Sequence, residues 1–205
     1  MDRKKWIAGF CILLGIVIMA VPACLRLGGE KRTQELMEEF EQKMESVDEE
    51  TQDENSKSEK RRKASAIPEG ENVIGIIEIE SLGIRYPIIE GTGSDALNSG
   101  IGHISDTAGI GESGNCVLCG HNGSRHGTFF TSLSGIKTGA VVELTDEDGY
   151  LYDYKVTETK VVDPHDNSIK DTDGTERLTL FTCANKGTMR FVCFCEPLES
   201  DLDEN

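Results

Sequence analysis

Three side chains with the chemistry of acyl transfer, a thiol, an imidazole and a guanidinium, stand at Cys183, His121 and Arg190. Cys183 ends an apolar run at 178–183 and His121 follows another at 116–120, so each could lie at the end of a strand. A thiol with a pKa of about 8.5 needs a base or a positive neighbour before it becomes a nucleophile. His121 could be that base, and Arg190 could return on the next strand to stabilise an oxyanion. The pattern predicts a cysteine acyl-transfer site.

Short β-branched runs separated by glycines must position these three residues. Apolar and polar residues alternate clearly at 150–156, and Asp148-Gly149 before this run is typical of a hairpin. Helical patterns are short, at 94–98 and 128–134. The chain is therefore predicted to be all-β, a barrel or a sandwich with short helical inserts.

The motifs around the three residues resemble those of the sortase family of cysteine transpeptidases. Thr179-Leu180-Phe181-Thr182-Cys183 fits the TLxTC signature of that family, and Cys119-Gly120-His121 lies where the family has a small residue followed by Gly and His. Arg190 stands at the position of the family's catalytic arginine. The similarity extends from Asn72 to about Leu198 and includes Phe129-Phe130-x-x-Leu133 and Gly135-x-x-x-Gly139. Cys119 departs from the pattern, because most relatives have a residue such as alanine there.

This resemblance implies an eight-stranded closed barrel of the sortase type and a two-step transpeptidation. A sorting signal of LPxTG type would be cleaved between Thr and Gly, and a cell-wall amine would resolve the thioacyl intermediate on Cys183. His121 would act as acid and base, and Arg190 would stabilise the transition state. Further substrate contacts are expected at Thr182, Leu180 and Asn122. The short connection before the cysteine strand and the lack of a lid motif indicate a class D-like enzyme, for which we expect no cofactor and no metal.

The N-terminal third of the chain predicts a membrane anchor followed by a charged linker. From Trp6 to Leu25 the sequence is apolar and long enough to span a bilayer as a helix. Arg3, Lys4 and Lys5 before it favour a cytoplasmic N-terminus. A cleaved signal peptide, a lipoprotein and a buried helix are the alternatives. The expected segments are the cytoplasmic N-terminus (1–5), the transmembrane anchor (6–27), the linker (28–66), the catalytic barrel (67–200) and the acidic tail (201–205).

One part of the linker has a helical pattern. Met37, Phe40, Met44 and Val47 recur at helical spacing. They predict an amphipathic helix that lies either on the membrane or against the domain.

The charge of the chain limits its partners. A formal net charge of -16 argues against nucleic acid, because binding there depends on clustered Lys and Arg. The expected partners are sorting-signal-bearing surface proteins and an amine of a cell-wall precursor or peptidoglycan. The catalytic domain is expected outside the cell, at the cell membrane. A thiol hydrolase or protease, and a non-catalytic membrane-tethered β-barrel that binds a partner, are the alternative functions.

Other potential ligands and bases are present in the chain. The expectation for Cys116, Cys119, Cys193 and Cys195 is free buried thiols, with a disulfide or a four-thiolate zinc site as alternatives. The histidines that could rival His121 as the base are His103, His126 and His165. A solvated turn, rather than a calcium site, is expected at Asp163, Asp166, Asp171 and Asp173.

Overall fold

A computed structural model describes residues 31–36, 38, 73–123 and 128–198 of the 205-residue chain. The predicted anchor, most of the linker and the acidic tail lie outside these residues. Within the described part, no helix has the length and apolar character that crossing a membrane requires.

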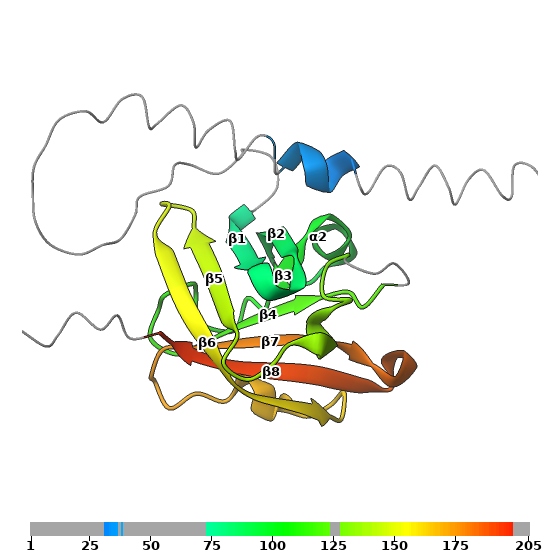
Figure 1. Ribbon diagram of the computed structural model, residues 1–205, viewed down its shortest axis with the longest axis vertical. Helices are drawn as coiled ribbons and strands as arrows, with labels where there is room; N and C mark the ends of the chain where they lie inside the picture. The colour runs from blue at the N-terminus through cyan, green and yellow to red at the C-terminus, as the bar shows by residue number, and fades with distance from the viewer. Residues whose placement is uncertain (1–30, 37, 39–72, 124–127, 199–205) are drawn as a thin grey trace, which may run out of the picture.

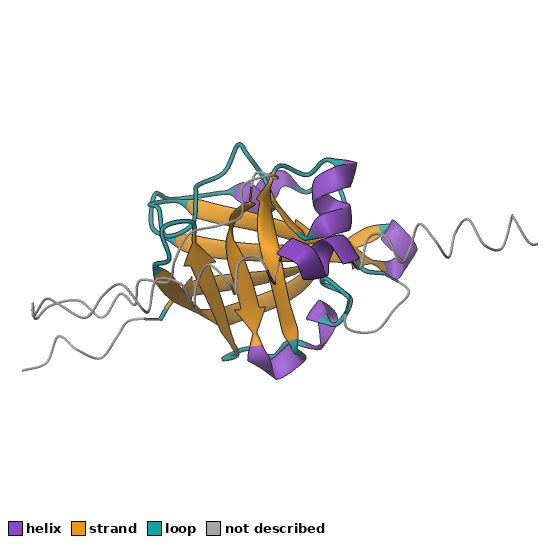
Figure 2. Cartoon of the chain, turned by 90° about the horizontal axis from the view of Figure 1, so that it is seen from above, coloured by secondary structure: helices purple, strands orange, loops and turns teal. Residues whose placement is uncertain are grey.

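Eight strands close into one barrel in the order β1-β2-β3-β4-β7-β8-β6-β5 (Figures 1 and 2). Pairing is antiparallel except between β2 and β3 and between β4 and β7, which are parallel. The predicted all-β, eight-stranded closed barrel is confirmed. The strands are β1 (Val73–Ile79), β2 (Ile84–Glu90), β3 (Ile101–His103), β4 (Asn115–Gly120), β5 (Val141–Asp146), β6 (Leu151–Val162), β7 (Arg177–Ala184) and β8 (Met189–Pro197).

Alternation of buried and exposed residues explains why these segments form a barrel. In β6, Tyr154 and Val156 are buried, whereas the alternating neighbours Asp153 and Lys155 are exposed. Successive side chains of a strand point to opposite faces, so one face of each strand can fill the interior. All eight strands contribute buried apolar side chains to one core cluster. Closure leaves the barrel without a free sheet edge.

Within the barrel, helical structure is confined to short inserts between the strands. The predicted helix at 94–98 is present as α2 (Ser94–Ser99). The helical pattern at 128–134 yields only turns followed by a 3-10 helix, because the positive φ of Phe129 is incompatible with an α-helix. The 3-10 helices are η1 (Glu80–Leu82), η2 (Leu133–Gly135), η3 (Asn167–Lys170) and η4 (Asn185–Gly187).

Candidate active site

The thiol and the guanidinium are brought together by the β7–β8 hairpin. Cys183 and Arg190 are direct partners in the antiparallel register. On the same two strands, Leu180 and Cys193 are also partners, and both belong to the core cluster. Side chains that are three residues apart on a strand point to opposite faces. Cys183 and Arg190 therefore lie on the outer face of the barrel, where each is half-buried.

The imidazole reaches the same place through the parallel pairing of β4 with β7. Gly120 pairs with Thr182, so His121 and Cys183 are the next residue on each strand. The side-chain amide of Asn122 donates a 2.8 Å hydrogen bond to the carbonyl of Cys183 and ties the two strand ends together. Carboxyl ends of parallel strands meet at one edge of a sheet, and His121 is exposed at this edge. The structure thus brings the three predicted residues to one rim of the barrel.

Gly120 is required by the packing beneath this rim. A Cβ atom at this position would lie 2.7 Å from the side chain of Ile101 and 2.9 Å from the ring of Phe130. Real Cβ atoms do not approach other heavy atoms so closely, and both neighbours are in the tightly packed core. A larger residue would push the end of β4, and with it His121, away from Cys183.

Leu180 and Thr182 support the site from below. The side chain of Leu180 is fully buried in the core, and that of Thr182 is 2% exposed. The hydroxyl of Thr182 donates a 2.7 Å bond to the carbonyl of Gly120, across the β4–β7 ladder. The alternation that turns Cys183 outward turns both side chains inward, where they support the ends of the strands. The expected contact of Leu180 and Thr182 with substrate stays a prediction.

The guanidinium of Arg190 is held by the turn that precedes it. Its Nη1 donates to the carbonyls of Gly187 and Met189, each at 3.1 Å. These bonds fix the planar group beside Cys183, which is its partner across the hairpin. A guanidinium has five N–H donors in a rigid fork, so a group held in this way can also donate to a developing oxyanion.

A second thiol, that of Cys119, lies close to the first. It points to the same outer face as Cys183 but is only 7% exposed. Burial, reinforced by the nearby Cys183 and opposed by Arg190, raises the pKa of Cys119 to about 12. A thiol with this pKa stays protonated near neutral pH and is a poor nucleophile. The departure from the family pattern at Cys119 therefore adds no competing nucleophile.

Sequence reasoning did not assign a role to Phe129, which contacts the imidazole. Its ring lies edge-on to His121 with the centroids 6.5 Å apart, and Tyr86 packs on its other side at 5.1 Å. Its backbone bridges to Asn122, and the amide of the next residue, Phe130, donates to the carbonyl of His121 at 3.1 Å. Phe129 adopts φ 48°, a strained conformation for a bulky residue. Such strain is concentrated at functional sites.

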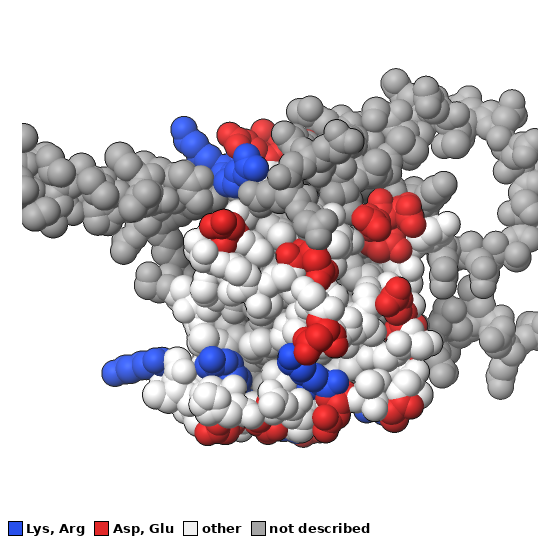
Figure 3. Space-filling model, turned by 180° about the vertical axis from the view of Figure 1, so that it is seen from behind, with Lys and Arg blue, Asp and Glu red and all other residues white. Residues whose placement is uncertain are grey.

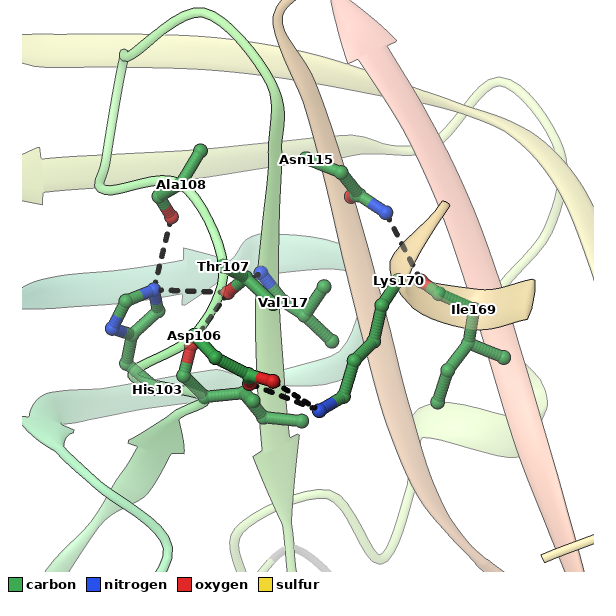
Figure 4. Close-up of polar contacts among 9 residues, drawn as sticks. His103, Asp106, Thr107, Ala108, Asn115, Val117, Ile169 and Lys170 are labelled. Carbon is green, nitrogen blue, oxygen red and sulfur yellow. Dashed lines mark hydrogen bonds and ion pairs between the residues drawn. The ribbon is translucent and has the colours of Figure 1, made fainter. Parts of the chain in front are cut away.

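The rival histidine His103 is part of a structural network (Figure 4). Its Nδ1 lies 2.7 Å from a carboxylate oxygen of Glu90 and its Nε2 lies 2.9 Å from the carbonyl of Ala108. Each ring nitrogen therefore has an oxygen partner within the protein. Burial acts to raise the pKa of Glu90, but hydrogen bonds from Ser105 and His103 and the charge of His103 lower it. The imidazole is 4% exposed, which leaves it unable to exchange protons with a substrate.

Of the remaining histidines, the structure describes only His165, and it does not place this residue at the rim. His165 lies in the turn after β6, where its backbone amide is bonded to Asp163. His126 lies outside the described residues.

Two loops at the end of β4 opposite to His121 are joined to each other (Figure 4). Lys170 of η3 bonds both carboxylate oxygens of Asp106, in the β3–β4 connection, at 2.9 and 3.1 Å. This bond from Lys170 lowers the pKa of Asp106. The amide of Asn115 donates to the carbonyls of Ile169 and Asp171 at 3.0 and 3.2 Å. The outer faces of β4 and β7 are therefore covered by connected loops at the end opposite to His121.

The acidic residues of the β6–β7 connection cap its turns. Asp163, Asp166 and Asp173 accept bonds from backbone amides two residues further along the chain. Among the residues that the structure describes, no group of three or more His, Cys, Asp and Glu side chains could hold a metal ion.

The other cysteines pack as small apolar side chains. All five cysteines of the described part are free, and Cys116, Cys193 and Cys195 belong to the barrel core. Burial raises the pKa of Cys116 to about 12. The zinc site that was an alternative would need Cys119, but that residue points to the opposite face.

Comparison with known proteins decides the family. The model of the sortase domain matches residues 77–198. The chain is 32% identical to Sortase D of Bacillus subtilis over 181 residues, which is 88% of this chain and 89% of that protein. The chain belongs to the sortase family. Sortases are cysteine transpeptidases, and the predicted class D-like character agrees with the similarity to Sortase D.

Solved sortase structures share the fold. Sortase A from Corynebacterium diphtheriae matches with a TM-score of 0.60 at 26% identity, covering 66% of this chain and 65% of that one. The chain thus spans slightly less than two thirds of that structure. Sortase D5 from Clostridium perfringens, described as a transpeptidase, also has a TM-score of 0.60, at 23% identity, and covers 83% of this chain and 98% of that one. This last likeness supports the fold alone.

Proposed function

We propose that this sortase uses Cys183, His121 and Arg190 to cleave a C-terminal sorting signal of LPxTG type and to transfer the protein to a cell-wall amine. The observation that supports this assignment best is the register of three neighbouring strands. It places a half-buried thiol between an exposed imidazole on β4 and a fixed guanidinium on β8. Nucleophile, acid/base and oxyanion donor are the three roles that acyl transfer to an amine requires.

The reaction proceeds in two balanced halves. His121 takes the proton of the Cys183 thiol, the sulfur attacks the carbonyl carbon of Thr in the signal, and Arg190 donates to the oxyanion that forms. The C–N bond to Gly breaks as His121 passes this proton to the leaving amine, which leaves a thioester on Cys183. An incoming amine then attacks this thioester and gives its proton to His121. The C–S bond breaks, and the departing sulfur takes that proton from His121, which restores the thiol. One imidazole serves both halves because an amine leaves and an amine arrives.

The surroundings of this reaction follow from the sequence and the family. The apolar segment at 6–27 anchors the protein as a single-pass membrane protein, and the barrel is extracellular. Its partners are surface proteins that carry a sorting signal and an amine of a cell-wall precursor or peptidoglycan. Asn122 adds a substrate contact at the exposed rim. The proton transfers and charge stabilisation use side chains alone, so the reaction needs no cofactor.

The test is product analysis with the purified full chain in detergent. A panel of LPxTG-like peptides is incubated with an added amine, and the products are identified by mass spectrometry. Cys183→Ala is the inactive variant, and Cys119→Ala is the matched control that removes the neighbouring thiol. Cleavage after Thr with joining to the amine, lost in the first variant and kept in the second, supports the proposal. Hydrolysis without transfer would favour a thiol protease, and no Cys183-dependent product would favour a binding domain.

A further inference from the structure

A short helix from the predicted linker lies against the barrel. Residues 31–36 and 38 are helical, and they are called the docking helix below. Leu36 is 5% exposed and packs in one apolar cluster with Val73, Ile89 and Ala96. The hydroxyl of Thr33 donates a 3.0 Å bond to the carbonyl of Ser99 at the end of α2. Met37, Phe40, Met44 and Val47, which carry the predicted amphipathic helix, lie outside the described residues.

The cluster around Leu36 has a consequence for the linker. Val73 begins β1, so the chain reaches the barrel at Leu36 and enters it at Val73, in the same apolar cluster. The residues between 38 and 73 therefore start and end at one side of the barrel. The length of this segment therefore does not set the distance between the barrel and the residues that precede the docking helix.

Only four residue steps separate the predicted anchor from the docking helix. The anchor is expected to end at residue 27, and the helix begins at Lys31. A fully extended chain spans at most about 14 Å over this distance. If 6–27 crosses the bilayer, the α2 side of the barrel is held within a few residue lengths of the lipid headgroups.

Charge favours the same orientation. On the face seen in Figure 3, Asp and Glu side chains are spread over the barrel, whereas Lys and Arg gather at the lower edge and at the top. The whole chain carries a formal net charge of -16. Such a surface gains nothing from an anionic bilayer on its own. The described part of the docking helix, by contrast, starts at the exposed Lys31, whose ammonium group suits headgroup phosphates.

The docked side of the barrel adjoins the candidate active site. Ser99, which accepts the bond from Thr33, is followed closely by β3, and Gly102 of β3 pairs with Cys119 of β4. His121 stands two residues after Cys119, at the end of β4. The docking helix and the catalytic rim thus lie near the same end of the β3–β4 pair.

We propose that the docking helix holds the barrel at the membrane surface, with the α2 side against the lipid headgroups and the catalytic rim beside them. The partner of this face is the bilayer itself. The inference rests on the proposed anchor at 6–27. A sorting signal or a lipid-linked amine that emerges from the membrane then meets Cys183 within a short distance, without having to reach around the barrel.

Energy transfer to lipid acceptors tests this orientation in the full chain reconstituted into nanodiscs. A donor is placed, through an encoded non-natural amino acid, at exposed Asn98 of α2 or at exposed Asn167 of η3. Figure 1 shows η3 on the side of the barrel away from the docking helix. Because a domain of this size is about 30 Å across, transfer from position 98 should exceed that from position 167 by about twofold or more.

Two variants with the same added charge separate docking from tethering. Leu36→Asp places a carboxylate in the apolar cluster and should release the helix, whereas Gln34→Asp places one on its exposed side. Without docking, only the chain from residue 27 to 73 connects the anchor to the barrel. A random coil of this length has a mean span of about 40 Å, so the difference between the two donor positions should disappear. In Gln34→Asp the difference should remain. Equal transfer from both positions in the native chain, or a difference that survives Leu36→Asp, would overturn the proposal.

Two further readouts keep this proposal apart from the proposed function. If alkaline carbonate extracts the chain from the bilayer, residues 6–27 do not form a transmembrane anchor, and the proposed orientation fails as well. The proposed chemistry at Cys183 does not depend on this result. Cleavage of a soluble peptide should be equal in native chain and Leu36→Asp, whereas cleavage of a signal embedded in the same bilayer should slow severalfold in Leu36→Asp. Equal rates on the embedded signal would contradict the placement of the rim beside the membrane.

Discussion

His103 ends β3 and His121 follows β4, the neighbouring strand, and of these two histidines only His121 is open to a substrate. His103 is buried, and both of its nitrogens are occupied by Glu90 and Ala108. His121 is exposed, is held through its backbone and an aromatic ring, and stands beside Cys183. The comparison teaches that a histidine becomes an acid or base when neighbours fix its position without consuming its nitrogens.

The largest expected effect comes from removing the exposed imidazole. His121→Ala should lower kcat/KM for peptide transfer by a factor of about 10²–10⁴, because proton transfer to the leaving amine is lost. Its melting temperature should stay close to that of the native protein. Steady-state kinetics beside a thermal scan checks both points. A variant that keeps native kinetics would show that another group carries the proton.

The buried imidazole should give the opposite result. His103→Ala leaves the carboxylate of Glu90 and the carbonyl of Ala108 without their donors, which should cost about 1–3 kcal/mol in the free energy of unfolding. The kcat of the folded fraction should change little. Urea unfolding measures the first quantity and active-site titration the second. A large fall in kcat at native stability would erase the distinction between the two histidines.

A smaller effect is expected at Phe129, where ring and backbone can be separated. Phe129→Ala removes the ring and keeps the strained φ of 48°, whereas Phe129→Gly removes both. The glycine variant should therefore be more stable than the alanine variant by about 1 kcal/mol. Both should lower kcat several-fold, with KM nearly unchanged, and both should move the NMR signals of His121. If Phe129→Leu restores stability but not kcat, the ring positions the imidazole.

The smallest effect concerns pH. The pKa of Glu90 is lowered in the folded state from its ordinary value of 4.5. A carboxyl of this kind contributes stability above its unfolded pKa, and this contribution is lost as the pH falls through the folded pKa. Stability should therefore decline below about pH 4.5 in the native protein and decline less steeply in Glu90→Gln. Parallel curves for the two proteins, measured by urea unfolding across the acid range, would contradict the pairing with His103.

Much of this architecture is readable from the sequence. Alternation, as at 150–156, specifies the strands, and the resemblance specifies their closure into a barrel. The register that joins Cys183 to His121 could be anticipated, because both follow apolar runs of similar length. The inward direction of Leu180 and Thr182 can also be predicted from the sequence, since a residue one or three positions from an outward cysteine must point inward.

Other features depend on contacts that no local pattern contains. The positive φ of Phe129 is set by the packing of Tyr86 and the bridge to Asn122, whereas the apolar spacing around it favours a helix. The docking helix carries the apolar side chain of Leu36, and no local pattern in the sequence says which surface covers it. The structure shows that Val73 and Ile89 do so.

The order of the strands also governs when the enzyme becomes active. The hydrogen bond from Asn122 to Cys183, which joins the two strand ends, spans 61 residues of the chain. Arg190 belongs to the last strand, which lies between β7 and β6. Contacts so distant in the chain form late in folding. A chain whose last strand is not yet in place therefore carries its thiol without a positioned base or guanidinium. The addition of β8, the last strand of the chain, therefore delays the cleavage of proteins until the barrel is closed.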